Sequence, residues 1–206
     1  MTALLIATGN AGKRREYDAL LGDLGLRLGS LADYPAAPAV AESGETYLAN
    51  ARLKAVSLAA FARLPALADD SGLEVDALGG APGVHSARYA ALAMGRSGSA
   101  DDQTNCRFLL GRLRGRPQPP YTARFRCVIV VAHPDGRELV ADGACEGRIV
   151  ETPRGDGGFG YDPIFFYPPL ARTFAELSAA EKDRISHRAL AVAALRPTLL
   201  DWLAAD

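Results

Sequence analysis

The order of apolar segments along the chain limits its fold more than any other feature. Near the start, an apolar run at Leu4–Ala7 leads into the turn residues Thr8-Gly9-Asn10, and helical periodicity follows from about Gly12. A second helix, from about Thr46 to Ala62, precedes another short apolar run at Ala66–Ala68. Such alternation of strands and helices is typical of α/β proteins.

The later part of the chain predicts antiparallel strands. Tyr121–Ala132 and Glu138–Cys145 have the composition of strands, and His133–Arg137 between them suits a hairpin connection. A further strand is expected at Ile164–Tyr167. We therefore predict an α/β fold with a mixed central β-sheet flanked by helices. The length of 206 residues allows a single domain, 1–206, and we expect two lobes with an active-site cleft between them.

Local signals predict the remaining helix boundaries. A weak S-x-x-D cap at Ser99–Asp102 and a capping box at Ser178–Glu181 each precede helical sequence. Helical sequence resumes through His187–Ala205, with a break or kink expected at Pro197. The segment Gly29–Gly44 contains two prolines and is expected to be a loop.

Charge and cysteine usage narrow the possible functions. The chain has 23 Lys and Arg against 24 Asp and Glu, and this net charge of −1 argues against nucleic acid polymers as partners. Three cysteines without CxxC spacing favour reduced thiols over a disulfide framework. The apolar runs at Ala3–Ala7 and Cys127–Ala132 are too short for a signal peptide core or a membrane span. We expect a cytoplasmic protein with no membrane partner.

The segment Thr8-Gly9-Asn10-Ala11-Gly12-Lys13 lies between the first predicted strand and helix. Backbone N–H groups at a helix N-terminus bind anions and Lys13 adds a full positive charge, so phosphate is the expected ligand. The segment is not a Walker loop, because its glycines are too close together and Arg14 stands where a hydroxyl is needed. The alternative is a tight strand–helix turn with a solvated lysine.

The segment Asp69-Asp70-Ser71-Gly72 follows a predicted apolar strand, at whose carboxyl end an open α/β sheet binds ligands. Adjacent carboxylates on extended backbone point to opposite sides, so one can face a ligand while the other holds structure. Carboxylate oxygens suit Mg²⁺ when phosphates supply further ligands. Glu42 and Glu45 are additional acidic candidates. The alternative is an Asx turn, for which Asp-Ser-Gly is favourable.

A glycine-rich segment, Gly155–Gly160, contains the pattern G-x-G-x-x-G. It does not predict a dinucleotide site, because Pro163 and strand-forming residues follow it where a helix is required. The segment does present Phe159 and Tyr161, and an aromatic ring there is a candidate for stacking on a nucleobase. Packing of both rings in the core is the alternative, and for Tyr161 it is the preferred interpretation.

Lys182, His187 and Arg188 lie around the start of the last helix. They are candidates for contacts with a base or a phosphate, with the guanidinium offering a planar set of donors. The alternative is a charged helix face. The histidines lack the spacing of metal ligands, so zinc is not expected.

Taken together, these segments resemble the inosine triphosphate pyrophosphatase family. The resemblance runs from Leu5 to the helix after Arg188, and several motifs occur in the family's order. They are Leu5–Asn10, Glu45–Ala55, Ala68–Leu73, Gly79–Tyr89, Gly157–Pro163 and Ser186–Arg188. The resemblance implies hydrolysis of aberrant purine nucleoside triphosphates, such as ITP, dITP and XTP, to the monophosphate and pyrophosphate. It also implies dependence on Mg²⁺ and a homodimer.

The resemblance assigns roles to individual residues. Thr8 to Lys13 matches the triphosphate-binding loop, with Asn10 and Lys13 as main contacts. Glu42 and Asp70 match the acids associated with Mg²⁺ and the attacking water, and Asp70 matches the general base. The residues that match substrate contacts are Ser71, Phe159, Gly160, Tyr161, Asp162, Lys182, His187 and Arg188. Among these, Phe159 to Asp162 match the segment that borders the base, and the last three match the residues that read its oxygenated edge.

Two other functions compete with this interpretation. One is a Maf-like nucleoside triphosphate pyrophosphatase with a different base preference. The other is a nucleotide-sensing protein without catalysis. The acids Glu42, Asp69 and Asp70 argue against a sensor, because a protein that only binds nucleotides has little need for carboxylates beside phosphate.

Overall fold

A computed structural model describes residues 2–116 and 120–205. Its strands and longer helices, in chain order, are β1 (Ala3–Ile6), α1 (Ala11–Leu21), β2 (Arg27–Ser30), α2 (Tyr47–Ala62), β3 (Ala66–Val75), α3 (Tyr89–Ala93), α4 (Asp102–Leu113), β4 (Tyr121–Ala132), β5 (Glu138–Ile149), β6 (Phe165–Tyr167), β7 (Arg172–Thr173), α5 (Ala179–Ile185) and α6 (His187–Ala204).

Within the described residues, the strands form a seven-stranded sheet in the order β2-β1-β3-β4-β5-β6-β7. β1 pairs in parallel with β2 and with β3, where Leu5 lies opposite Ala66. β6 pairs antiparallel with both β5 and β7. This mixed sheet with flanking helices confirms the predicted α/β class.

The chain divides into two compact units. Unit 1 consists of Met1–Asp70, Cys127–Gly143 and His187–Asp206, and unit 2 consists of Ser71–Arg126 and Ala144–Ser186. The long strands β3, β4 and β5 each contribute residues to both units. Two units agree with the expected pair of lobes.

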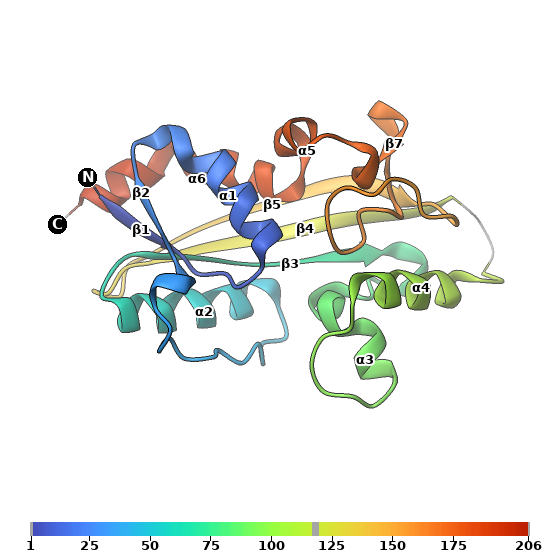
Figure 1. The fold of residues 1–206 in the computed structure, drawn as a ribbon, viewed down its shortest axis with the longest axis horizontal. Coiled ribbons are helices and arrows are strands. Elements are labelled where there is room, and N and C mark those ends of the chain that lie inside the picture. The colour runs from blue at the N-terminus through green and yellow to red at the C-terminus, as the bar shows by residue number, and fades with distance from the viewer. Residues whose placement is uncertain (1, 117–119, 206) are drawn as a thin grey trace. The chain divides into compact units, whose positions relative to one another are not determined.

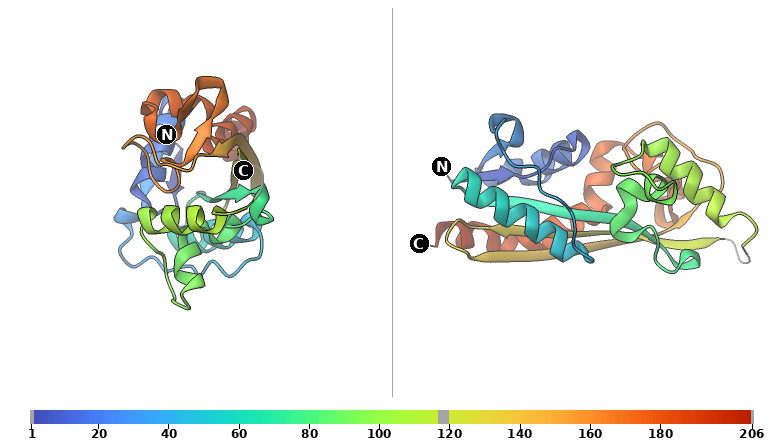
Figure 2. Two further views of the ribbon diagram at one scale, coloured as in Figure 1. Left: turned by 90° about the vertical axis from the view of Figure 1, so that its right-hand side faces the viewer. Right: turned by 90° about the horizontal axis from the view of Figure 1, so that it is seen from below.

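The core of unit 1 follows from the alternation of side chains along its strands. Leu4 and Ile6 of β1 belong to a buried cluster with residues of α1 and α6, whereas Leu5 and Ala7 belong to a cluster with residues of α2. Helices therefore cover both faces of this part of the sheet (Figures 1 and 2). A sheet buried on both faces explains why the apolar run at Leu4–Ala7 is continuous rather than alternating.

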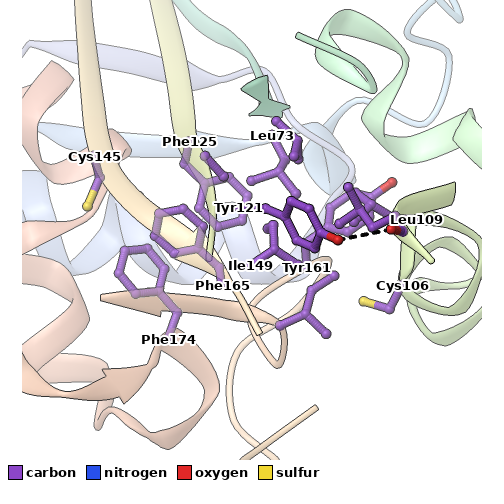
Figure 3. Packing of buried hydrophobic residues seen from close by; sticks show 14 of the residues in the cluster. Leu73, Cys106, Leu109, Tyr121, Phe125, Cys145, Ile149, Tyr161, Phe165 and Phe174 are labelled. Carbon is purple, nitrogen blue, oxygen red and sulfur yellow. Dashed lines mark hydrogen bonds between the residues drawn. The ribbon is translucent and has the colours of Figure 1, made fainter. Parts of the chain in front are cut away.

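The core of unit 2 is aromatic. The ring centroids of Phe125 and Phe165 lie 4.6 Å apart, and the Phe174 ring lies 4.8 Å from that of Phe165 (Figure 3). Tyr121 is buried beside them and its hydroxyl donates a hydrogen bond to the Leu113 carbonyl at 3.1 Å. The glycine-rich segment 155–160 and α5 belong to this unit.

The structure corrects the predicted end of the third strand. β3 runs without interruption from Ala66 to Val75, so Asp69 and Asp70 lie inside the strand and not at its carboxyl end. Aspartate and glycine are rare inside strands, which made a strand end the expected interpretation. The carboxylates are tolerated here because cationic and amide side chains bind them.

Two other expectations need correction. The expected loop at Gly29–Gly44 begins with the last two residues of the edge strand β2, whose Arg27 pairs with Ala3 of β1. The helix α6 continues through Pro197 to Ala204, so no break occurs there. Both departures reflect pairing or packing with distant segments, which overrides local propensity.

The cap of α4 also differs from the prediction. Asp101 is the N-cap residue, and its carboxylate accepts hydrogen bonds from the N–H (2.8 Å) and the hydroxyl (2.7 Å) of Thr104. Ser99 lies two residues further from the helix and is exposed. By contrast, the capping box at Ser178–Glu181 is present as predicted.

The three cysteines are free and buried. Burial raises the pKa of each thiol, Cys106, Cys127 and Cys145, to about 12. This agrees with the expectation of reduced thiols. Within residues 2–116 and 120–205, no helix has the length and apolar character needed to cross a membrane.

The position of the α4 cap can be tested with two alanine variants. Asp101→Ala should lower the melting temperature by about 3 °C, because it removes the side-chain acceptor for the first turn of α4. Ser99→Ala, the matched control, should leave the melting temperature unchanged. Calorimetry measures the melting temperature of both variants. An equal decrease in the two would contradict the assignment of Asp101 as the N-cap residue of α4.

Candidate functional site

The segment Thr8–Lys13 in unit 1 forms a capped helix N-terminus. The Asn10 side chain accepts a hydrogen bond from the Lys13 N–H at 3.0 Å, and the Thr8 hydroxyl accepts one from the Asn10 N–H at 3.2 Å. The N–H groups of the first helical turn have no acceptor within the helix. Gly9, Asn10 and Ala11 are exposed, so these donors are accessible to an anion.

Lys13 is held at this helix start by a buried carboxylate. Its ammonium lies 2.8 Å from Asp69 Oδ2, and the same oxygen accepts a hydrogen bond from Arg188 Nη2 at 3.2 Å. The other terminal nitrogen of Arg188 donates to Glu16. The Asp69, Arg188 and Glu16 side chains are each 1% exposed. The result is a chain of alternating charges, Glu16–Arg188–Asp69–Lys13, whose last member reaches the helix N-terminus.

Asp69 and Asp70 point to opposite faces of β3, as predicted for neighbours on extended backbone. Asp69 contacts Lys13 of α1 and Arg188 of α6, whereas Asp70 contacts Asn50 of α2. The adjacent carboxylates therefore lie in different surroundings, although both are buried.

The two surroundings shift the two pKa values in opposite directions. Burial by itself would raise the pKa of Asp69, but the positive charges of Lys13, Arg188 and Lys54 outweigh it and hold this pKa far below the usual range. Burial raises the pKa of Asp70, and the charge of Lys54 and the hydrogen bond from Asn50 only partly oppose that effect. Asp69 is thus firmly ionised, whereas Asp70 accepts a proton more readily than an ordinary aspartate.

Asn50 links Asp70 to the acidic loop before α2. Its side-chain N–H donates to Asp70 Oδ2 at 3.0 Å, and its carbonyl oxygen accepts the Gly44 N–H at 2.8 Å. A Cβ at Gly44 would lie 2.7 Å from the Ala49 Cβ, so only glycine fits this close approach. One turn further along α2, Lys54 contacts Glu42 Oε1 at 2.5 Å. Glu42 of the loop and Asp70 of β3 therefore both bind side chains of α2.

Glu42 and Asp70 are the residues of unit 1 that could hold a magnesium ion. Glu42 and Asp70 offer hard carboxylate oxygens, and burial, with a smaller effect of the Glu42 charge, raises the pKa of Asp70. Within the described ranges, no group of three or more His, Cys, Asp or Glu side chains is arranged to hold a metal. Mg²⁺ usually retains waters and takes further ligands from substrate phosphates, so it is the cation that two carboxylates alone could hold.

In unit 2 the structure brings together Phe159, Asp162 and Lys182. Asp162 Oδ2 accepts hydrogen bonds from the Phe159 N–H at 2.9 Å and from the Lys182 ammonium at 2.5 Å. That ammonium also lies 4.6 Å from the centroid of the Phe159 ring. Gly158 has a φ of +72°, and a Cβ there would collide with the Asp162 carboxylate. The turn that presents Phe159 therefore requires glycine at this position.

The remaining candidate residues lie in different surroundings. Tyr161 is buried in the unit 2 core and its hydroxyl donates to the Ser86 carbonyl at 2.8 Å, in agreement with the preferred interpretation from sequence. Gly160 N–H donates to Asp102 at 2.6 Å. Ser71 is partly buried within β3. His187, which is 5% exposed, begins α6.

Sequence reasoning missed three residues of these networks: Glu16, Asn50 and Lys54. Asn50 and Lys54 lie within the Glu45–Ala55 motif, one helical turn apart, and an amide among buried positions was a usable signal for a shared polar face. Glu16 lies three residues after Lys13, but its partner Arg188 is 172 residues away. No local pattern predicts that pairing.

Comparison with known proteins identifies the family of the chain. The Ham1 family model matches residues 4–198. A dITP/XTP pyrophosphatase of Geobacillus kaustophilus is 49% identical over 195 residues, which cover 95% of this chain and 93% of that protein. A dITP/XTP pyrophosphatase of Thermus thermophilus is 50% identical over 192 residues, covering 93% and 89%.

A solved structure is also similar. The structure of a HAM1 protein from Coxiella burnetii has a TM-score of 0.86 and 38% sequence identity to this chain, and the match covers 98% of this chain and 100% of that one. The chain belongs to the Ham1 family.

The opposite pKa shifts predict opposite effects of two neighbouring substitutions on the stability of metal-free protein. At pH 7, Asp69→Asn should cost about 3 kcal/mol, because Arg188 loses the buried charge that balances it. Asp70→Asn should stabilise the protein, because it removes a carboxylate whose ionised form is disfavoured by burial. Denaturant unfolding in the presence of a chelator measures both free energies.

The pH dependence follows from the same shifts. Asp69 has a lowered pKa in the folded state, so its contribution is present above about pH 4 and is lost on further acidification. Asp70 has a raised pKa, so the gain in Asp70→Asn is largest at neutral pH and vanishes as pH falls toward about 4. If both variants change the free energy of unfolding in the same direction at neutral pH, the opposite pKa shifts assigned to Asp69 and Asp70 are refuted.

Proposed function

We propose that this protein hydrolyses non-standard purine nucleoside triphosphates, namely dITP, ITP and XTP, to the nucleoside monophosphate and pyrophosphate. The observation that carries the proposal is in unit 1, where Lys13 at a helix N-terminus pairs with Asp69, the neighbour of a buried Asp70 with a raised pKa. A phosphate-binding cation stabilises the charge of the leaving pyrophosphate, and a proton-accepting carboxylate activates the attacking water. The names of the relatives from Geobacillus and Thermus support the choice of dITP and XTP.

The triphosphate binds to the segment from Thr8 to Lys13. The N–H groups of the first turn of α1 donate to phosphate oxygens, and the ammonium of Lys13 balances their charge. Because these groups are fixed before the reaction, they stabilise the charge that develops on the leaving pyrophosphate without reorganisation. Asn10 contributes as the cap that orders this turn.

Glu42 and Asp70 are the residues that would hold Mg²⁺. When bound, the ion would neutralise charge on the phosphate oxygens. Asn50 fixes the orientation of Asp70 through its 3.0 Å hydrogen bond and connects it with the loop that carries Glu42.

Asp70 acts as the general base. It accepts a proton from the water molecule that attacks the α-phosphorus, and the bond from that phosphorus to the bridging oxygen of pyrophosphate breaks. The raised pKa suits this role, because a base works best when its pKa lies near the operating pH. Asp69, which is held ionised by Lys13 and Arg188, is unsuited to accept the proton.

The base of the nucleotide is recognised by residues of the glycine-rich segment and by residues around the start of α6. Phe159 supplies a ring for stacking, worth about 1–3 kcal/mol, and Lys182, His187 and Arg188 supply donors for the keto oxygen at position 6. Further contacts come from Ser71, Gly160 and Asp162, whereas Tyr161, which is buried in the unit 2 core, lies in the segment that borders the base. Adenine presents an amino group at position 6, so donors would oppose donors, and such mismatches discriminate by about 10⁴-fold.

We further propose that the whole chain, 1–206, works as one pyrophosphatase domain, as a homodimer and in the cytoplasm. The matches to relatives along 93–95% of the chain support the single domain.

A panel of nucleotides with identification of the products tests the substrate class. With Mg²⁺ present, dITP and XTP should give pyrophosphate and the monophosphate, with kcat/KM about 10⁴-fold above that for dATP. dGTP, dTTP and UTP complete the panel. Highest activity on a pyrimidine nucleotide would favour a Maf-like enzyme, and binding of ITP without pyrophosphate release would favour a sensor.

The roles of Lys13 and Asp70 predict different kinetic defects. Asp70→Asn should lower kcat for dITP by about 10²–10⁴-fold, because the general base is lost while the fold is retained. Lys13→Ala should lower kcat/KM mainly by raising KM, because phosphate binding is weakened. Arg15→Ala removes an exposed cation from the same helix and is the matched control, with unchanged kinetics. Steady-state assays with dITP distinguish the variants, and near-normal kcat in Asp70→Asn excludes it as the base.

A further inference from the structure

Lys54 of α2 contacts Glu42, one of the proposed magnesium ligands, and the mechanism above does not use it. Its ammonium lies 2.5 Å from Glu42 Oε1, and its side chain is 15% exposed. Burial alone would lower the pKa of Lys54, but the carboxylates of Asp69, Glu42 and Asp70 together raise it. A firmly protonated ammonium therefore lies among three carboxylates.

The helix α2 places this ammonium beside the proposed magnesium ligands. Asn50 and Lys54 are one turn apart, so they project from the same face of α2. Asn50 holds Asp70, and Lys54 holds Glu42. A magnesium ion on these two carboxylates would share the Glu42 carboxylate with the Lys54 ammonium that is now bonded to it.

Charge balance makes this competition strong. The side chains named in the Asp69 network and in the contacts of Asn50 and Lys54 include three cations and four carboxylates, whose formal charges sum to −1. They are Lys13, Lys54 and Arg188 with Glu16, Glu42, Asp69 and Asp70. Adding a divalent cation alone would reverse the sign of the site, whereas adding it together with an anionic triphosphate would not.

We propose that Lys54 is the internal counter-ion of the magnesium site, which occupies Glu42 in the nucleotide-free enzyme and keeps its affinity for Mg²⁺ low until a triphosphate binds. The inference rests on the proposed function, because it takes Glu42 and Asp70 as the metal ligands. Its physical basis is the repulsion between an ammonium and a divalent cation that require the same carboxylate, which is strong at a partly buried position. Metal binding is thereby coupled to nucleotide binding.

Calorimetric titration of nucleotide-free protein with MgCl₂ tests the proposal. Lys54→Met should bind Mg²⁺ about tenfold more tightly than the unaltered protein, which corresponds to 1.4 kcal/mol. Lys54→Arg keeps the charge and should bind Mg²⁺ as the unaltered protein does. Arg52→Met, the matched control, removes an exposed cation of α2 that pairs with Glu138 and should leave the affinity unchanged.

Two further variants separate the inference from the function on which it rests. Glu42→Gln and Asp70→Asn should both weaken Mg²⁺ binding; if neither does, the proposed metal site is wrong. If both do, but Lys54→Met binds Mg²⁺ equally or less tightly, the counter-ion role is refuted. Lys54→Gln retains a donor for Glu42 and carries the test if Lys54→Met does not fold, as judged by circular dichroism.

Discussion

The buried carboxylate of Asp69 is the interaction on which the rest of unit 1 depends. One of its oxygens binds Lys13 of α1 and Arg188 of α6, so a single side chain of β3 joins both helices on that face of the sheet. Arg188 in turn binds Glu16, which returns the network to α1. A buried charge without its partner is costly, so each member of the chain requires the next. The helix α1, whose N-terminus is the proposed phosphate site, is fixed in place by this network.

The two adjacent aspartates of β3 have different environments, which suit Asp69 to a structural role and Asp70 to its proposed role as a base. Strand geometry turns Asp69 and Asp70 to opposite faces, and the helices on those faces give them different neighbours. Two cations make Asp69 a permanent anion, whereas a neutral amide contacts Asp70 and leaves it able to accept a proton. The difference between the two residues therefore comes from the helices α1, α2 and α6 and not from their own sequence.

The sequence predicted those features that arise from short-range physics. The turn at Thr8–Lys13 and the capping box at Ser178–Glu181 depend on residues within a few positions of each other, and both were found. The continuation of β3 through Asp70 was missed, because its carboxylates are stabilised by partners up to 119 residues away. For the same reason, Arg188 was expected to reach the base, but its terminal nitrogens bind Glu16 and Asp69 inside unit 1. Its role in reading the base stays a prediction.

The three buried cysteines also have a practical consequence. Because thiolates react and thiols do not, groups with a pKa near 12 are almost inert toward maleimides at neutral pH. A cysteine introduced at an exposed position in each unit would then be labelled selectively in the otherwise unaltered chain. Fluorophores attached in this way would report the separation of the two units in solution while nucleotide binds.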